Sequence, residues 1–163
     1  MTSPRVDALV ARLEKGRQKT FEIFSALTPE QWQRQVYPDP PWRVRDLLAH
    51  FVSAETYLPA IAQEVASGGP GAAPDLDIDR VNAAEQARLE GLLPSVLLEL
   101  LNEKRRQTMA WVNTLSDEQL ERVGRHPALG EVTVEAMVTA IYGHQLMHMR
   151  DLARLAGSGE GVG

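Results

Sequence analysis

The stretch from Val134 to Leu155 repeats its core-facing residues at the three- and four-residue spacing of an amphipathic helix. Two of the repeating positions hold imidazoles where the pattern otherwise holds aliphatic side chains, at His144 and His148. Four residues turn an α-helix by about 400°, so these two side chains point the same way, one turn apart. The stretch predicts a long helix that carries a histidine pair on its apolar face.

Three other segments carry the same helical period, and no segment predicts a strand as clearly. They cover about residues 4–27, 44–66 and 96–115. Pro59 lies inside the second of them and should kink it, because proline cannot donate the helical hydrogen bond. A shorter helical segment is expected between Asp79 and Pro94.

The connectors are read from their turn residues. Prolines force residues 37–42 to be extended, and the glycine-rich residues 67–78 predict a flexible linker. Residues 125–133 read as a turn or a short extended pair. Residues 157–163, GSGEGVG, predict a flexible tail.

These elements predict an all-α fold, an antiparallel four-helix bundle. Connectors of about fifteen residues between the first and second long helices, and between the third and fourth, permit crossover connections. A length of 163 residues, with 44% hydrophobic residues, is typical of one soluble domain, here residues 1–163.

Composition narrows the expected partners. A net charge of −5 argues against nucleic-acid binding, which needs a basic face. No apolar run approaches the ~20 residues of a membrane span, and no signal peptide is evident, so a cytoplasmic location is the default expectation. Cysteine is absent, so any metal must be held by His, Asp or Glu.

His50, on the second long helix, is the candidate third member of the histidine set. An isolated histidine pair at this spacing is more often part of a core than a metal site. Three neutral imidazoles inside a bundle need polar partners, however, and one metal ion would bind all three. His126, in a connector, is expected at the surface.

Two motifs in this chain resemble those of the DinB/YfiT-like superfamily. Residues 42–50, WRVRDLLAH, resemble its W-x-x-x-D-x-x-x-H signature, and residues 143–150, GHQLMHMR, resemble its C-terminal HxxxH helix. The order and spacing of the remaining segments are similar too, so the resemblance covers nearly the whole chain. Arg43 departs from it, because many relatives have a small helix-capping Ser or Thr there; a weaker cap is expected.

The resemblance implies a four-helix bundle with crossover connections, a homodimer, and a divalent metal bound by three histidines. Carried over by position, the ligands are His50, His144 and His148. Such a set leaves coordination positions open, as in catalytic sites. Nitrogen ligands suit zinc or nickel, and iron or manganese also accept them.

The chemistry implied is that of a metal-dependent hydrolase or a transferase that uses a low-molecular-weight thiol, with an unknown substrate. Metal-bound water or a metal-bound thiolate would then be the reacting group. The resemblance also implies thiols such as bacillithiol or mycothiol as cofactors. The alternative is a non-catalytic bundle that sequesters a small molecule or binds a protein, with a structural or vestigial metal.

Three carboxylates lie near the histidines in sequence. Asp46 either orients His50 or favours the start of its helix, and the pattern does not choose. Asp151 is expected to be a solvated charge. Glu55 lies about 140° around the helix from His50, which makes ligation alongside it awkward.

Overall fold

The computed structural model describes the chain as far as Ser158, and its side chains as far as Arg154. The helices are α1 (Pro4–Ser25), α2 (Pro29–Trp32), α3 (Val44–Ala66), α4 (Ile78–Leu89), α5 (Pro94–Val112), α6 (Asp117–Glu121) and α7 (Val134–Ser158). The strands are β1 (Val123–His126) and β2 (Gly130–Thr133), which pair as an antiparallel hairpin. The expected extended pair is therefore present.

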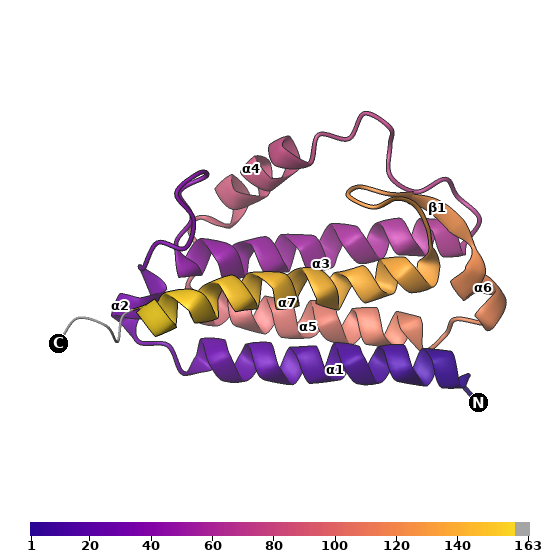
Figure 1. The fold of residues 1–163 in the computed structure, drawn as a ribbon, viewed down its shortest axis with the longest axis horizontal. Coiled ribbons are helices and arrows are strands. Elements are labelled where there is room, and N and C mark those ends of the chain that lie inside the picture. Colours follow the sequence, from indigo (N-terminus) through magenta and orange to yellow (C-terminus); the bar gives the residue numbers. More distant parts are fainter. Residues whose placement is uncertain (159–163) are drawn as a thin grey trace.

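The four long helices α1, α3, α5 and α7 form the bundle, and their order in space differs from their order in sequence (Figure 1). Helix α1 packs against α5 and α7, and α3 packs against the same two helices. Consecutive helices, α1 with α3 and α5 with α7, thus lie across the bundle from each other. The expected crossover connections are confirmed. Not all neighbours are antiparallel, because α3 and α5 run in the same direction (Figure 1).

Helix α3 starts where the sequence predicts, but its first turn is capped from inside the helix. The carboxylate of Asp46 accepts hydrogen bonds from the backbone N–H of Arg43 at 2.9 Å and from its guanidinium at 3.0 Å. A carboxylate in the first turn also suits the positive end of the helix dipole. Arg43 therefore departs from the usual Ser or Thr without leaving the helix start unsatisfied.

One ion pair lies within the apolar interior of the bundle. Arg105 of α5 donates to both carboxylate oxygens of Glu55 on α3, at 2.6 and 2.9 Å, and to the backbone carbonyl of Leu13 on α1 at 3.0 Å. Both charged side chains are 1% exposed. The pair thus links α1, α3 and α5, and Glu55 is not a member of the group formed by the three histidines.

Residues 67–78 are not a free linker, because part of the segment lies against the hairpin. Arg125 of β1 donates its backbone N–H to Pro70 and accepts from the backbone N–H of Ala72, at 2.9 and 2.8 Å. Between them Gly71 has a φ of 88°, and a Cβ there would lie 2.5 Å from the Arg125 carbonyl oxygen. Only glycine fits this conformation and this close approach.

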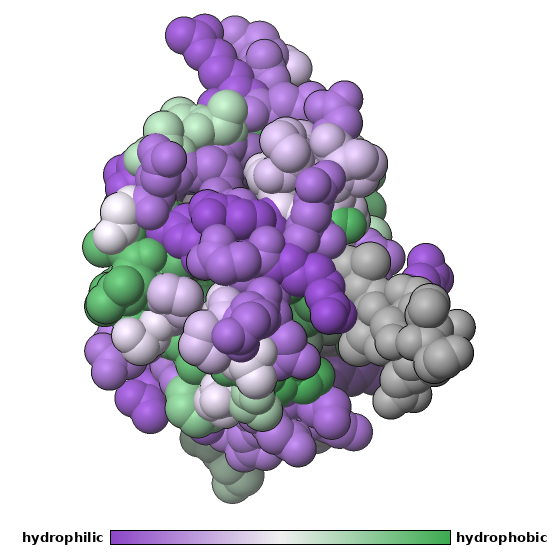
Figure 2. Space-filling model, turned by 90° about the vertical axis from the view of Figure 1, so that its left-hand side faces the viewer, coloured by the Kyte–Doolittle hydropathy of each residue, from purple (hydrophilic) through white to green (hydrophobic). Residues whose placement is uncertain are grey.

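The C-terminal part of the chain departs from the expected tail. Helix α7 continues to Ser158, so the first two residues of the expected flexible segment 157–163 are helical. The others lie outside the described residues. Among the described helices, none is long and apolar enough to cross a membrane. The end of the bundle that carries α2 is largely hydrophilic, with separate apolar areas between the polar groups (Figure 2).

Candidate metal centre

Helices α3 and α7 bring the three predicted histidines together. Nε2 of His144 lies 2.9 Å from Nε2 of His50 and 3.1 Å from Nε2 of His148. One ligand atom from each of the three residues lies within 4.8 Å of the others. The cluster is therefore a property of the fold, since His50 is 94 residues from His144 in sequence.

Burial keeps these imidazoles uncharged near neutral pH. It lowers the pKa of His50 to about 3, with a further lowering from the charges that His144 and His148 would carry. It lowers the pKa of His144 to about 4. The pKa of His148 is also lowered by burial, against a smaller raising effect from Asp151. Neutral imidazole is the form that binds metals.

Hydrogen bonding alone does not account for this arrangement. The Nε2 atom of His144 faces two other ring nitrogens, yet a neutral imidazole nitrogen carries at most one proton to share. Its one in-plane proton or lone pair can point at only one of these neighbours, so the two short contacts cannot both be well-directed hydrogen bonds. Nitrogen ligands around a single zinc-sized cation lie roughly 3.0–3.4 Å apart, given metal–nitrogen distances of about 2.0–2.1 Å. The donor set and its spacing fit a divalent metal ion.

Tyr37 and Asp151 hold the outer nitrogen of His148. The Tyr37 hydroxyl lies 2.7 Å from Nδ1 of His148 and donates to Asp151 at 2.6 Å. Because the hydroxyl proton goes to the carboxylate, Nδ1 of His148 is the donor and its Nε2 carries the free lone pair. Asp151 is therefore not simply a solvated charge, and sequence reasoning did not single out Tyr37.

The other two histidines lack such support among the described residues. Nδ1 of His50 and Nδ1 of His144 are buried without a hydrogen-bond partner there. The side chain of Asp46 bonds to Arg43 and Arg45 and makes no hydrogen bond to His50. Its role at the start of α3 therefore accounts for its contacts. His50 is packed by Trp42, whose ring centroid lies 4.8 Å from the centroid of the imidazole.

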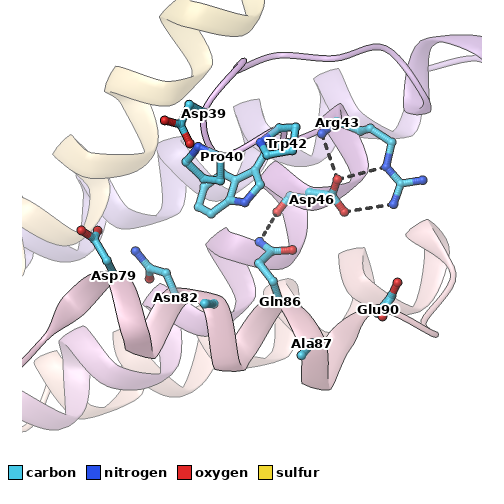
Figure 3. A pocket seen from close by; sticks show the side chains of 12 residues that line it. Asp39, Pro40, Trp42, Arg43, Asp46, Asp79, Asn82, Gln86, Ala87 and Glu90 are labelled. Carbon is cyan, nitrogen blue, oxygen red and sulfur yellow. Dashed lines mark hydrogen bonds and ion pairs between the residues drawn. The ribbon is translucent and has the colours of Figure 1, made fainter.

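A cavity of about 930 Å³ adjoins the three histidines. Its walls come from α3, α4, α7 and the hairpin turn, and they are largely apolar. Trp42 and Asn82 line this cavity and also a neighbouring one of about 890 Å³, where Asp39, Asp79 and Glu90 are found (Figure 3). An apolar cavity with a few convergent polar groups is the usual form of a small-molecule site.

His126 lies in the wall of the first cavity, so the expectation that it is a surface residue is wrong. It is 7% exposed, because β1 turns its side chain inward. Burial lowers its pKa. The strand's burial alternates along VGRH, a signal too short to recognise in the sequence.

The comparisons with known proteins agree with this fold. The family model of the DinB superfamily matches residues 12–152. YfiT from Bacillus subtilis, described as a probable metal-dependent hydrolase, is 23% identical, with a TM-score of 0.71 over 96% of this chain and 90% of that one. A mycothiol-dependent maleylpyruvate isomerase is 14% identical with a TM-score of 0.73; the match covers 90% of this chain and 60% of the isomerase. No curated protein matches this sequence.

A third similar structure corrects the expectation about nucleic acid. The colibactin self-resistance protein ClbS, crystallised in complex with double-stranded DNA, is 16% identical with a TM-score of 0.70 over 93% of this chain and 94% of its own. A protein with this fold can therefore bind DNA. The net charge of −5 does not support the exclusion that the sequence suggested.

Proposed function

We propose that this chain, which belongs to the DinB superfamily, is a metal-dependent enzyme that acts on a small molecule in the cavity beside His50, His144 and His148. The single observation that supports it best is the convergence of three uncharged Nε2 atoms at one edge of that cavity. When bound there, a divalent ion would supply Lewis acidity to a water or a thiol. The metal's identity is proposed as zinc or nickel from the all-nitrogen donor set.

The protein's own residues have separate parts in this proposal. His50, His144 and His148 hold the ion, and Tyr37 fixes the ring of His148 in the tautomer that ligation needs. Trp42 packs on the ring of His50, and the largely apolar cavity walls would bind the apolar part of a substrate. Apart from Glu135, the described residues of the cavity lining include no carboxylate, and Glu135 is paired with Arg5 at 2.6 Å. A reacting water or thiol would therefore depend on the ion for its activation.

Metal analysis of protein purified without a histidine tag tests the proposal first. We expect about one zinc or nickel ion per chain, as three nitrogen ligands on one centre imply. His148→Ala should lose most of the metal, and Leu146→Ala, an exposed neighbour on the same helix, should retain it. Failure of the native protein to take up either ion at micromolar concentration would refute the metal centre.

The hydrolase and thiol-transferase forms of the proposal make different demands. The first needs only metal and substrate, whereas the second needs a low-molecular-weight thiol. The resemblance to YfiT favours the first, and that to the isomerase favours the second. Titration of the cobalt-substituted protein with mycothiol or bacillithiol separates them, because a thiolate bound to cobalt gives a new charge-transfer absorption band.

A homodimer and a cytoplasmic location remain predictions. Sedimentation of the purified protein checks the first of them.

A second candidate function is binding to double-stranded DNA. The ClbS complex favours it, because that protein shares the fold. Retardation of a labelled duplex at low salt, lost as salt rises, would support it.

The non-catalytic alternative, a bundle that sequesters a small molecule, is distinguished by a His50→Ala variant. Such a bundle would still bind its small molecule after this variant has lost the metal.

A further inference from the structure

The cavity beside the histidines offers little to a charged molecule. Apolar or aromatic side chains make up most of its wall, among them Tyr57, Leu58, Ile78, Leu129 and Met147. Lysine and arginine are missing from the described lining. A charged group placed away from the metal would lose its hydration without gaining a partner, which is costly. The wall therefore favours an uncharged occupant.

His126 provides a polar group with a fixed direction in this wall. Its Nδ1 accepts hydrogen bonds from the backbone N–H groups of Ala128 and Leu129, at 3.1 and 3.2 Å. Both backbone groups can only donate, so Nδ1 must carry a lone pair and the ring proton must be on Nε2. The hairpin turn thus sets the tautomer, and His126 can only donate from Nε2.

That donor has no partner in the part of the chain that the structure describes. Nε2 of His126 is buried, and its side chain is more than nine-tenths covered. An unsatisfied buried N–H group is unfavourable, and native proteins rarely keep one without a use. Because Nε2 itself has almost no exposed surface and His126 lines the cavity, an oxygen on the occupant would satisfy it after a small movement of the side chains in the wall.

We infer that the cavity takes an uncharged, mainly apolar molecule with an oxygen acceptor, such as a carbonyl, which accepts a hydrogen bond from Nε2 of His126. His126 is then a specificity-determining residue at the wall formed by the hairpin turn. The inference rests on the proposed function only in taking this cavity as the substrate site. Its own claim concerns the cavity wall and does not require a metal.

Two probes of nearly equal shape test the hydrogen bond. Acetophenone carries a carbonyl where α-methylstyrene carries a CH₂ group. Each is titrated into metal-free full-length protein, so that the carbonyl cannot bind a metal, and followed by NMR. The variant is His126→Asn, because the Asn side-chain oxygen can accept from Ala128 and Leu129 in place of Nδ1. Its thermal unfolding shows whether the turn is preserved.

We expect His126→Asn to weaken acetophenone binding about three- to tenfold, the usual net effect of one hydrogen bond. α-Methylstyrene binding should change less than about twofold by the same reasoning. Equal weakening of both probes, or no weakening of acetophenone, would overturn the proposal. So would the failure of both probes to bind native protein up to their solubility limits, or benzoate binding as tightly as acetophenone.

A second measurement uses the native protein and needs no variant. In ¹⁵N NMR spectra His126 should have a protonated Nε2 and an unprotonated Nδ1. Acetophenone should shift the Nε2–H resonance strongly, and α-methylstyrene should shift it little. The opposite tautomer, or equal shifts with both probes, would contradict the proposal. Since these tests use metal-free protein, their failure is distinct from failure to bind metal.

Discussion

The hydroxyl of Tyr37 lies 2.7 Å from Nδ1 of His148, and it donates a hydrogen bond to the carboxylate of Asp151 at 2.6 Å. Tyr37 comes from the proline-rich segment before α3, whereas His148 and Asp151 lie one turn apart on α7. A tyrosine and a carboxylate acting in series thus orient the ring and leave its Nε2 lone pair directed at the other two histidines. Burial and the neighbouring carboxylate raise the pKa of Tyr37, so the hydroxyl keeps its proton.

Removal of this hydroxyl should weaken metal binding while leaving the three histidines in place. For Tyr37→Phe we expect a loss of about 10-fold or more in affinity for zinc, measured by competition with a chromophoric chelator. Tyr142→Phe is the matched control, because the Tyr142 hydroxyl binds Arg12 instead. An unchanged affinity in Tyr37→Phe would show that the hydroxyl does not support the ligand.

The metal-free protein should lose stability as the pH falls below 6.5. The pKa values of His50 and His144 are about 3 and 4 in the folded state, against about 6.5 in the unfolded chain. Below 6.5 the unfolded state therefore binds more protons, which favours unfolding. The stabilisation is complete above that pH and is lost progressively as the pH falls to about 3. Urea unfolding between pH 7 and 5 should show this decline, and His50→Phe should decline less steeply. If the free energy of unfolding fell equally steeply with pH in the native protein and in His50→Phe, the prediction would be wrong.

The buried pair of Glu55 and Arg105 should be intolerant of the loss of one partner. Arg105→Met leaves the Glu55 carboxylate buried without its main partner, and we expect a loss of about 3–5 kcal/mol in the free energy of unfolding. The double variant Glu55→Leu with Arg105→Met should be less destabilised than the single one, because no charge is left unpaired. Urea titration of both variants decides. Arg17→Met, which removes a partly exposed pair with Glu14, is a control with a loss below about 1 kcal/mol.

Gly71→Ala should separate the 67–78 segment from the hairpin. An added Cβ would lie 2.5 Å from the carbonyl oxygen of Arg125, in a backbone conformation that alanine avoids. We expect a loss of about 1–3 kcal/mol in the free energy of unfolding and faster amide hydrogen exchange at Ala72. Gly91→Ala is the comparison, since its Cβ would meet no atom within 4 Å. Unchanged exchange at Ala72 would refute the strained contact.

Much of this architecture could be predicted from periodicity. The apolar residues that repeat at helical spacing predicted α3 over its full extent, Val44–Ala66, and placed His144 and His148 on one face of α7. The resemblance of residues 42–50 and 143–150 to one family joined His50 to that pair. Periodicity is informative here because a helix converts sequence spacing into direction.

The interactions that pattern reasoning missed join elements whose relative placement the sequence does not specify. Tyr37 meets His148 across 111 residues, and Arg105 meets Glu55 across 50. In each case the local pattern gives the direction of one side chain and nothing about the facing element. His126 was misplaced for a related reason: a four-residue strand whose inward positions are Gly124 and His126 carries too short a pattern.

The three histidines belong to two long helices of the bundle, whereas residues 127–129 of the cavity wall lie in the turn between β1 and β2. Turns of this kind accept substitution and changes in length more readily than packed helices do. Evolution can therefore alter what this cavity admits without disturbing the three histidines or the bundle interior. Chains that share the same three histidines can accordingly diverge in what their cavity binds, and the hairpin turn is the place to look for the differences.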